Sequence, residues 1–142
     1  MTPRQIQLIR ASFAPLQPLA ASVAEAFYAQ LFARDPALRA LFAGGDMGQQ
    51  GERLMQMLAA AIGLLDRPAA LEPVLLRLGQ RHAGYGVVDA HYASVGAALL
   101  DTLAAGLGDA FTAEMHDAWA TMYGHVAETM QRGAAAGEAL AA

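Results

Sequence analysis

The chain of 142 residues contains no cysteine, and this absence removes several classes of site. It excludes disulfides, thiolate zinc sites, iron–sulfur clusters and cofactors attached through thioether bonds. Lysine is absent as well, so the chain has neither the lysine of a phosphate-binding Walker A loop nor a lysine that could form a Schiff base. P-loop NTPases and pyridoxal-dependent enzymes are therefore excluded.

Charged residues are scarce at 15%, whereas hydrophobic residues make up 56% of the chain. This excess indicates apolar surface that covers something besides the protein itself, either an apolar ligand or an oligomer interface. A net charge of −4 argues against nucleic-acid binding. No window holds 18 consecutive apolar residues, and the N-terminal MTPRQIQLIR lacks the apolar centre of a signal peptide. We therefore expect a cytoplasmic protein that does not enter a membrane.

The length is that of one domain, and the apolar residues follow a helical period. We predict helices over about 3–14, 19–34, 49–65, 73–84, 89–107 and 112–131, with a short helical turn over 36–42. No segment alternates as a strand does. The predicted fold class is all-α, with about six long helices and one or two short ones. The segment 133–142 has little to bury and is expected to fray beyond a folded domain of residues 1–132.

His82 ends the most informative of these helices. Leu75, Leu78 and His82 share one helix face, so an apolar stripe ends in an imidazole. If Pro73 is the first helical residue, this helix is short, which suits an element that positions a chemical group. The imidazole is either a packed core histidine or a ligand, and the spacing alone leaves both open. The other histidines end no such stripe and are expected in solvent or in polar contacts: His91, His116 and His125.

Common enzyme motifs are missing. The chain has no GxSxG, HExxH or GxGxxG, and no histidine follows a glutamate by three residues, which excludes a ferritin-like di-iron site. A haem site instead needs one imidazole with a free nitrogen, an apolar slot and polar groups that can donate hydrogen bonds. The candidate donors are Tyr28 and Gln50, because each lies on the apolar side of its helix. Taken singly, Tyr28 could merely seal the rim of the core, and Gln50 could be a solvated residue of the first turn.

The run RHAGYGVVDAHYASVGAALL resembles the globins, and more closely the single-domain bacterial globins and the haemoglobin domain of flavohaemoglobins. The segments FYAQLFARDPALRALF, LMQML and AWATMYG share the resemblance, which covers about residues 4 to 131. It implies a globin fold, with helices around a haem pocket, and a non-covalently bound haem b. In this family the iron is held by a histidine, and His82 matches that position.

The resemblance also assigns roles to other residues. Phe42 matches the phenylalanine that stacks against the haem. Tyr28, Gln50 and Leu54 match the distal tyrosine, glutamine and leucine that stabilise the bound ligand, although the loop before Gln50 is about three residues shorter than in flavohaemoglobins. Further cofactor contacts are expected at apolar or aromatic positions: Val87, Tyr92, Val95, Leu99 and Tyr123.

One position departs from the family pattern. In flavohaemoglobins the proximal histidine is linked to a tyrosine and a glutamate that make it a stronger electron donor. Tyr92 keeps the tyrosine, but the glutamate position falls at about Ala134, and Glu128 lies off that helix face. We therefore expect a weaker electron donation from His82 than in flavohaemoglobins.

Three functions follow from these patterns. The main expectation is a globin that reversibly binds O₂, and also CO and NO, at ferrous iron, for oxygen transport or storage. The alternative is nitric oxide dioxygenation, which needs an external reductase because this sequence has no flavin reductase domain; whether the chain is an enzyme therefore stays open. The third is a haem-free helical interaction module in which His82 is structural. The resemblance also allows a homodimer.

Overall fold

The computed structural model describes the backbone of residues 1–141 and the side chains of residues 1–137. It contains six α-helices and no strand within that part of the chain, which confirms the all-α prediction. The helices are α1 (Pro3–Phe13), α2 (Ala20–Arg34), α3 (Met47–Gly63), α4 (Pro68–Gly84), α5 (Asp89–Leu107) and α6 (Ala113–Ala141). Short 3₁₀ segments follow α1, α2 and α5: η1 (Ala14–Leu19), η2 (Pro36–Phe42) and η3 (Gly108–Ala110).

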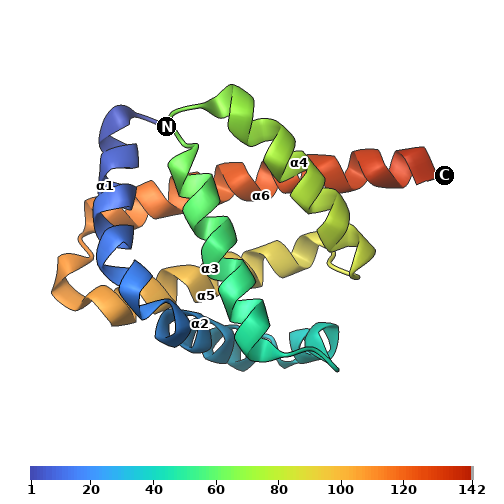
Figure 1. The fold of residues 1–142 in the computed structure, drawn as a ribbon, viewed down its shortest axis with the longest axis horizontal. Coiled ribbons are helices and arrows are strands. Elements are labelled where there is room, and N and C mark those ends of the chain that lie inside the picture. The colour runs from blue at the N-terminus through green and yellow to red at the C-terminus, as the bar shows by residue number, and fades with distance from the viewer. Residues whose placement is uncertain (142) are drawn as a thin grey trace.

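Helix α6 runs across the whole molecule as its longest element (Figure 1). It packs against α1, α4 and α5, while α2 packs against both α3 and α5. Figure 1 shows α3 crossing α5 and α6, and α4 crossing α6, so the helices do not all run parallel as in a bundle. None of the described helices combines the length and the hydropathy of a membrane-spanning segment.

Capping residues explain where two of the helices begin. The Thr2 hydroxyl accepts from the Gln5 amide at 3.1 Å and the Gln5 side chain accepts from the Thr2 amide at 2.9 Å, which is the predicted capping box. The Asp46 carboxylate accepts from the Gly48 and Gln49 amides, so α3 begins at Met47, two residues earlier than predicted.

The helix that carries His82 differs from the prediction. It begins at Pro68 and not at Pro73, and it is 17 residues long. Pro68 takes the first helical position, where a missing amide hydrogen costs nothing, whereas Pro73 lies exposed in the second turn and removes one helical hydrogen bond. The prediction of a short helix was therefore wrong, and shortness is no argument for the role of His82.

The last helix extends into the segment that was expected to fray. Helix α6 continues through Ala141 where fraying was expected from residue 133, and Ala142 lies outside the described residues. Gly133 is buried, because α6 comes so close to α4 that a side chain at Gly133 would overlap the backbone of Leu76. The expected boundary after residue 132 thus falls inside a helix that still packs on its neighbour.

A buried polar chain ties α1 to α6. Trp119 is fully buried and its Nε1 donates to the Ser12 hydroxyl at 2.8 Å. Ser12 in turn donates to the carbonyl of Leu8, one turn earlier, at 2.7 Å. Burying the indole and the hydroxyl is tolerated because each polar atom has a partner.

Replacing Ser12 by Ala should therefore destabilise the fold. The variant leaves the buried Trp119 N–H without an acceptor, which typically costs about 1 to 3 kcal/mol. The free energy of unfolding in urea, followed by tryptophan fluorescence, measures the loss. Ser22→Ala, at an exposed position of α2, is the matched control and should leave the free energy nearly unchanged; equal effects in the two variants would contradict the proposed role of the buried hydrogen bond.

Candidate functional site

The crossing of α2 over α3 is close because Gly51 has no side chain. A Cβ atom at Gly51 would lie 2.9 Å from the Cβ of Ala24, so any larger residue would push the two helices apart. The crossing brings Gln50, beside Gly51, next to Tyr28, one turn after Ala24. Burial raises the pKa of the Tyr28 hydroxyl, and an interaction with the Gln50 side chain partly opposes that rise. The two predicted distal donors therefore lie together.

Phe42 joins this pair at the end of η2. Its ring centroid lies 5.4 Å from that of Tyr28, with the rings at 70°, and 5.5 Å from that of Phe32, at 67°. Both are edge-to-face geometries, which are favourable arrangements for a pair of aromatic rings. Phe42 itself is only half-buried, so part of its side chain is left uncovered by the protein.

His82 has one ring nitrogen occupied and the other free. Its Nδ1 lies 2.9 Å from the carbonyl oxygen of Leu78, one turn earlier in α4. A carbonyl can only accept, so Nδ1 carries the proton and Nε2 keeps its lone pair. Burial lowers the pKa of His82 below its usual value of 6.5, which favours the neutral ring. The side chain is thus prepared to bind a metal through Nε2.

Val87 lies immediately beyond the end of α4. Its amide donates to the carbonyl of His82 at 3.0 Å, and this bond ties the loop after the helix to the histidine. Val95 lies on α5, where it is half-buried. Both of these predicted cofactor contacts therefore keep apolar surface that the protein itself does not cover.

Tyr92 of α5 and Tyr123 of α6 are neighbours joined by a hydrogen bond. The Tyr123 hydroxyl donates to the backbone carbonyl of Tyr92 at 2.6 Å. The ring of Tyr123 fits against Gly96, where a Cβ atom would lie only 2.6 Å from Cε2 of the ring. Burial raises the pKa of both tyrosines. The hydroxyl of Tyr123 is therefore engaged by the protein, and this residue can offer a ligand only its ring.

This pair predicts a loss of stability at high pH. Because the pKa of Tyr123 is raised in the fold above its usual value of 10.0, the folded chain holds its proton more tightly than the unfolded chain does. The contribution of protonated Tyr123 to the free energy of unfolding is therefore complete below pH 10 and is lost as the pH rises further. Tyr123→Phe should make the fall in unfolding free energy above pH 10 less steep, as measured by urea titrations at several pH values. An equally steep fall in the variant would show that Tyr123 does not contribute.

The link expected between His82 and Tyr92 is not formed. Nδ1 of His82 bonds to Leu78, and no hydrogen bond joins His82 to Tyr92 among the described residues. Glu128 is exposed on α6, and Ala134, at about the position expected for the glutamate, has no carboxylate. A neutral carbonyl is thus the hydrogen-bond partner of the imidazole, and no carboxylate takes that place.

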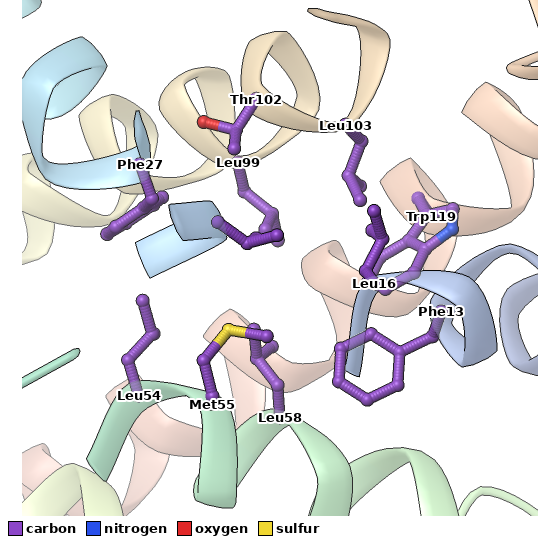
Figure 2. Close-up of a pocket in the computed structure, with 11 residues that line it drawn as sticks. Phe13, Leu16, Phe27, Leu54, Met55, Leu58, Leu99, Thr102, Leu103 and Trp119 are labelled. Carbon is purple, nitrogen blue, oxygen red and sulfur yellow. The ribbon is translucent and has the colours of Figure 1, made fainter. Parts of the chain in front are cut away.

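Leu54 and Leu99 line one small cavity between α2, α3 and α5 (Figure 2). Phe27 and Leu58 share the cavity, and its one hydroxyl, that of Thr102, donates to the carbonyl of Ala98 at 2.7 Å. Figure 2 shows the apolar side chains converging on the space between the helices. The cavity therefore offers no free polar group to a ligand.

The sequence did not point to Gly51, Gly96 or Gly79, which allow neighbouring elements to come close. The only signal in the sequence is a glycine inside a predicted helix. Such a glycine destabilises the helix by about 1 kcal/mol relative to alanine, so its presence indicates that close packing requires it. That signal identifies a position without saying what approaches it.

Comparison with known proteins decides the family. The globin family model matches residues 25–130, which is most of the chain. The chain belongs to the globin family. It is 34% identical over 132 residues to a flavohemoprotein of Deinococcus radiodurans and 35% identical over 132 residues to one of Bordetella parapertussis, with 92% of this chain aligned in each case. It is also 36% identical over 119 residues to neuroglobin of Danio rerio, where 75% of each chain is covered.

This globin spans about a third of the length of the flavohemoproteins, 33% in both cases. The family implies a haem group, and the residues of this chain fit one. His82 presents a free Nε2, and apolar side chains from several elements stay half-buried where a flat apolar group would cover them: Phe42, Leu54, Leu78, Val87 and Val95. His82 would hold the iron and these side chains would enclose the ring.

Proposed function

We propose that this globin carries haem b and reversibly binds O₂, and also CO and NO, for oxygen transport or storage. The observation that carries the proposal is the bond from Nδ1 of His82 to the Leu78 carbonyl, because it leaves Nε2 free, while burial lowers the pKa of His82 and so favours the neutral ring. Haem, when bound through that nitrogen, supplies ferrous iron with one further position for a diatomic gas.

Tyr28 and Gln50 are the polar groups available to such a gas. The raised pKa of Tyr28 keeps its hydroxyl protonated at neutral pH, so it can donate a hydrogen bond. The Gln50 amide is a second donor beside it. Leu54 contributes an apolar side chain that excludes water from their neighbourhood. We infer that the pair slows release of bound O₂.

Reversibility is tested by cycling the reduced, haem-loaded protein between argon and air. The expected result is an absorption spectrum that changes in air and returns fully under argon over repeated cycles. Rapid, irreversible conversion to the ferric form in every cycle would contradict a transport or storage role.

The alternative is nitric oxide dioxygenation with an external reductase. It is supported by the similarity to flavohemoproteins over 92% of the chain. The neutral partner of His82 argues for reversible binding instead, because a carbonyl makes an imidazole a weaker electron donor than a carboxylate does. Steady-state consumption of NO in the presence of a generic reductase separates the two: sustained turnover favours the enzyme, and a single turnover favours the carrier.

A further inference from the structure

Helix α4, which carries His82, depends on one neighbour for its position. Among the described residues, α6 is the only helix with which α4 makes extensive contacts, and Figure 1 shows α4 crossing the C-terminal half of α6. The buried residues of α4 are Leu71, Leu75 and Gly79, whereas His82 is only half-buried. Where α4 sits on α6 therefore decides where the imidazole sits.

Two glycines allow α4 and α6 to meet backbone to backbone. A Cβ atom at Gly79 of α4 would lie 1.9 Å from the carbonyl oxygen of Met130 in α6. A Cβ atom at Gly133 of α6 would lie 2.1 Å from the carbonyl oxygen of Leu76 in α4. Both distances are far below any real contact, and the atoms opposite belong to the main chain, which cannot turn aside as a side chain can.

The two contacts are reciprocal and close to the histidine. Gly79 lies three residues before His82, less than one helical turn, and directly follows Leu78, whose carbonyl accepts from Nδ1. The imidazole and its acceptor belong to the same rigid helix. A displacement of α4 would therefore move the two together and leave their hydrogen bond intact, while Nε2 changes its place relative to the rest of the site.

We propose that Gly79 and Gly133 are positioning residues for His82: by letting α4 and α6 touch through their backbones, they set the point from which Nε2 reaches the iron. The proposal rests on the proposed function insofar as it makes His82 the haem ligand. Neither glycine touches the ligand itself, and both act through the separation of the two helices.

The glycines of these helices form a graded series for the test. Gly79→Ala and Gly133→Ala collide with backbone. Gly137→Ala meets only the flexible Gln80 side chain, at 3.0 Å, and serves as the milder variant if the first two fold poorly. The matched controls are Gly84→Ala in α4, two residues from His82, and Gly124→Ala in α6, because a Cβ atom at either position meets nothing within 4 Å.

The first measurement is made on the haem-loaded ferrous protein. We expect Gly79→Ala and Gly133→Ala to lose haem at least roughly tenfold faster, equivalent to about 1.4 kcal/mol, and to shift or broaden the iron–histidine stretching band in resonance Raman spectra. Gly137→Ala should show a smaller change in the same direction. Gly84→Ala and Gly124→Ala should keep the wild-type band and rate, and should gain stability because alanine favours helices.

Ser12→Ala distinguishes positioning from general loss of stability, because it weakens the α1–α6 contact without touching α4. Its stretching band should match that of the wild type. The proposal is overturned if Ser12→Ala shifts the band as the glycine variants do, or if Gly79→Ala and Gly133→Ala leave both band and rate unchanged.

A second measurement does not require haem. The chain has no cysteine, so spin labels can be attached at cysteines introduced for the exposed Arg77 of α4 and Glu128 of α6. To remove the overlap that either alanine would create, the two helices must move apart by roughly 1 Å or more. Pulsed EPR should therefore show a longer distance between the two labels in Gly79→Ala and Gly133→Ala, and an unchanged distance in Gly84→Ala. An unchanged distance contradicts the positioning role. Failure of the wild-type chain to retain haem, with the distances lengthened as expected, contradicts the proposed function instead.

Discussion

His82→Ala should abolish tight haem retention, the largest effect expected of any single substitution in this chain. Removing a partner that merely orients a metal ligand typically costs about 10- to 100-fold in metal affinity, so removing the ligand itself should exceed roughly 100-fold. Haem loss is measured by transfer to an excess of an acceptor protein. Loss of the ring removes the nitrogen whose lone pair is left free by the Leu78 bond.

His125→Ala is the matched control, since His125 is exposed on α6. It should retain haem as the wild type does. His82→Gly with added imidazole should recover the wild-type ferrous spectrum, because the free base can occupy the vacated space. If His82→Ala itself keeps a normal five-coordinate ferrous spectrum, His82 is not the iron ligand.

Tyr28→Phe should release O₂ about five- to tenfold faster, because a hydrogen bond of about 1 kcal/mol or more is removed and such losses act mainly on dissociation. The substitution keeps the ring and therefore its edge-to-face contacts with Phe27 and Phe42. Stopped-flow or flash photolysis gives the off-rate. A rate equal to that of the wild type would falsify the assignment of Tyr28 as a donor.

Gln50 and Gln49 provide the matched pair for the second donor. Gln50→Leu should also speed release, whereas Gln49→Leu, at the neighbouring exposed position, should not. Because the Tyr28 and Gln50 side chains interact, the double variant should show less than the sum of the two single effects. Additive effects would mean that the two groups act independently.

The sequence was enough for the all-α class and for most of the helices, whereas the roles assigned to the site residues stay predictions. The stripe that ends at His82, the capping box at Thr2 and the apolar side of α2 at Tyr28 are local patterns, and local patterns can be read without a structure. The start of α4 could not be predicted from a local pattern, since both Pro68 and Pro73 suit a first helical position. Only the packing of Leu71 on the core makes the earlier start favourable.

Two features of the site were missed, one because it involves the backbone and the other because it joins distant segments. The acceptor for Nδ1 of His82 is a backbone carbonyl, which no residue type identifies; the family pattern had indicated Tyr92 instead. The approach of α4 to α6 joins Gly79 to Met130 and Gly133 to Leu76, pairs separated by more than fifty residues. Only the folded chain shows which glycines serve such a crossing.

Whether this globin binds haem through His82 and leaves a site for a gas can be measured with one set of absorption spectra. The chain is expressed with ample haem, purified, reduced, and measured before and after CO is added. We expect a strong Soret band, a five-coordinate ferrous spectrum and a sharp, shifted Soret band with CO. A purified protein without a Soret band would contradict this expectation and favour a haem-free helical module in which His82 is structural.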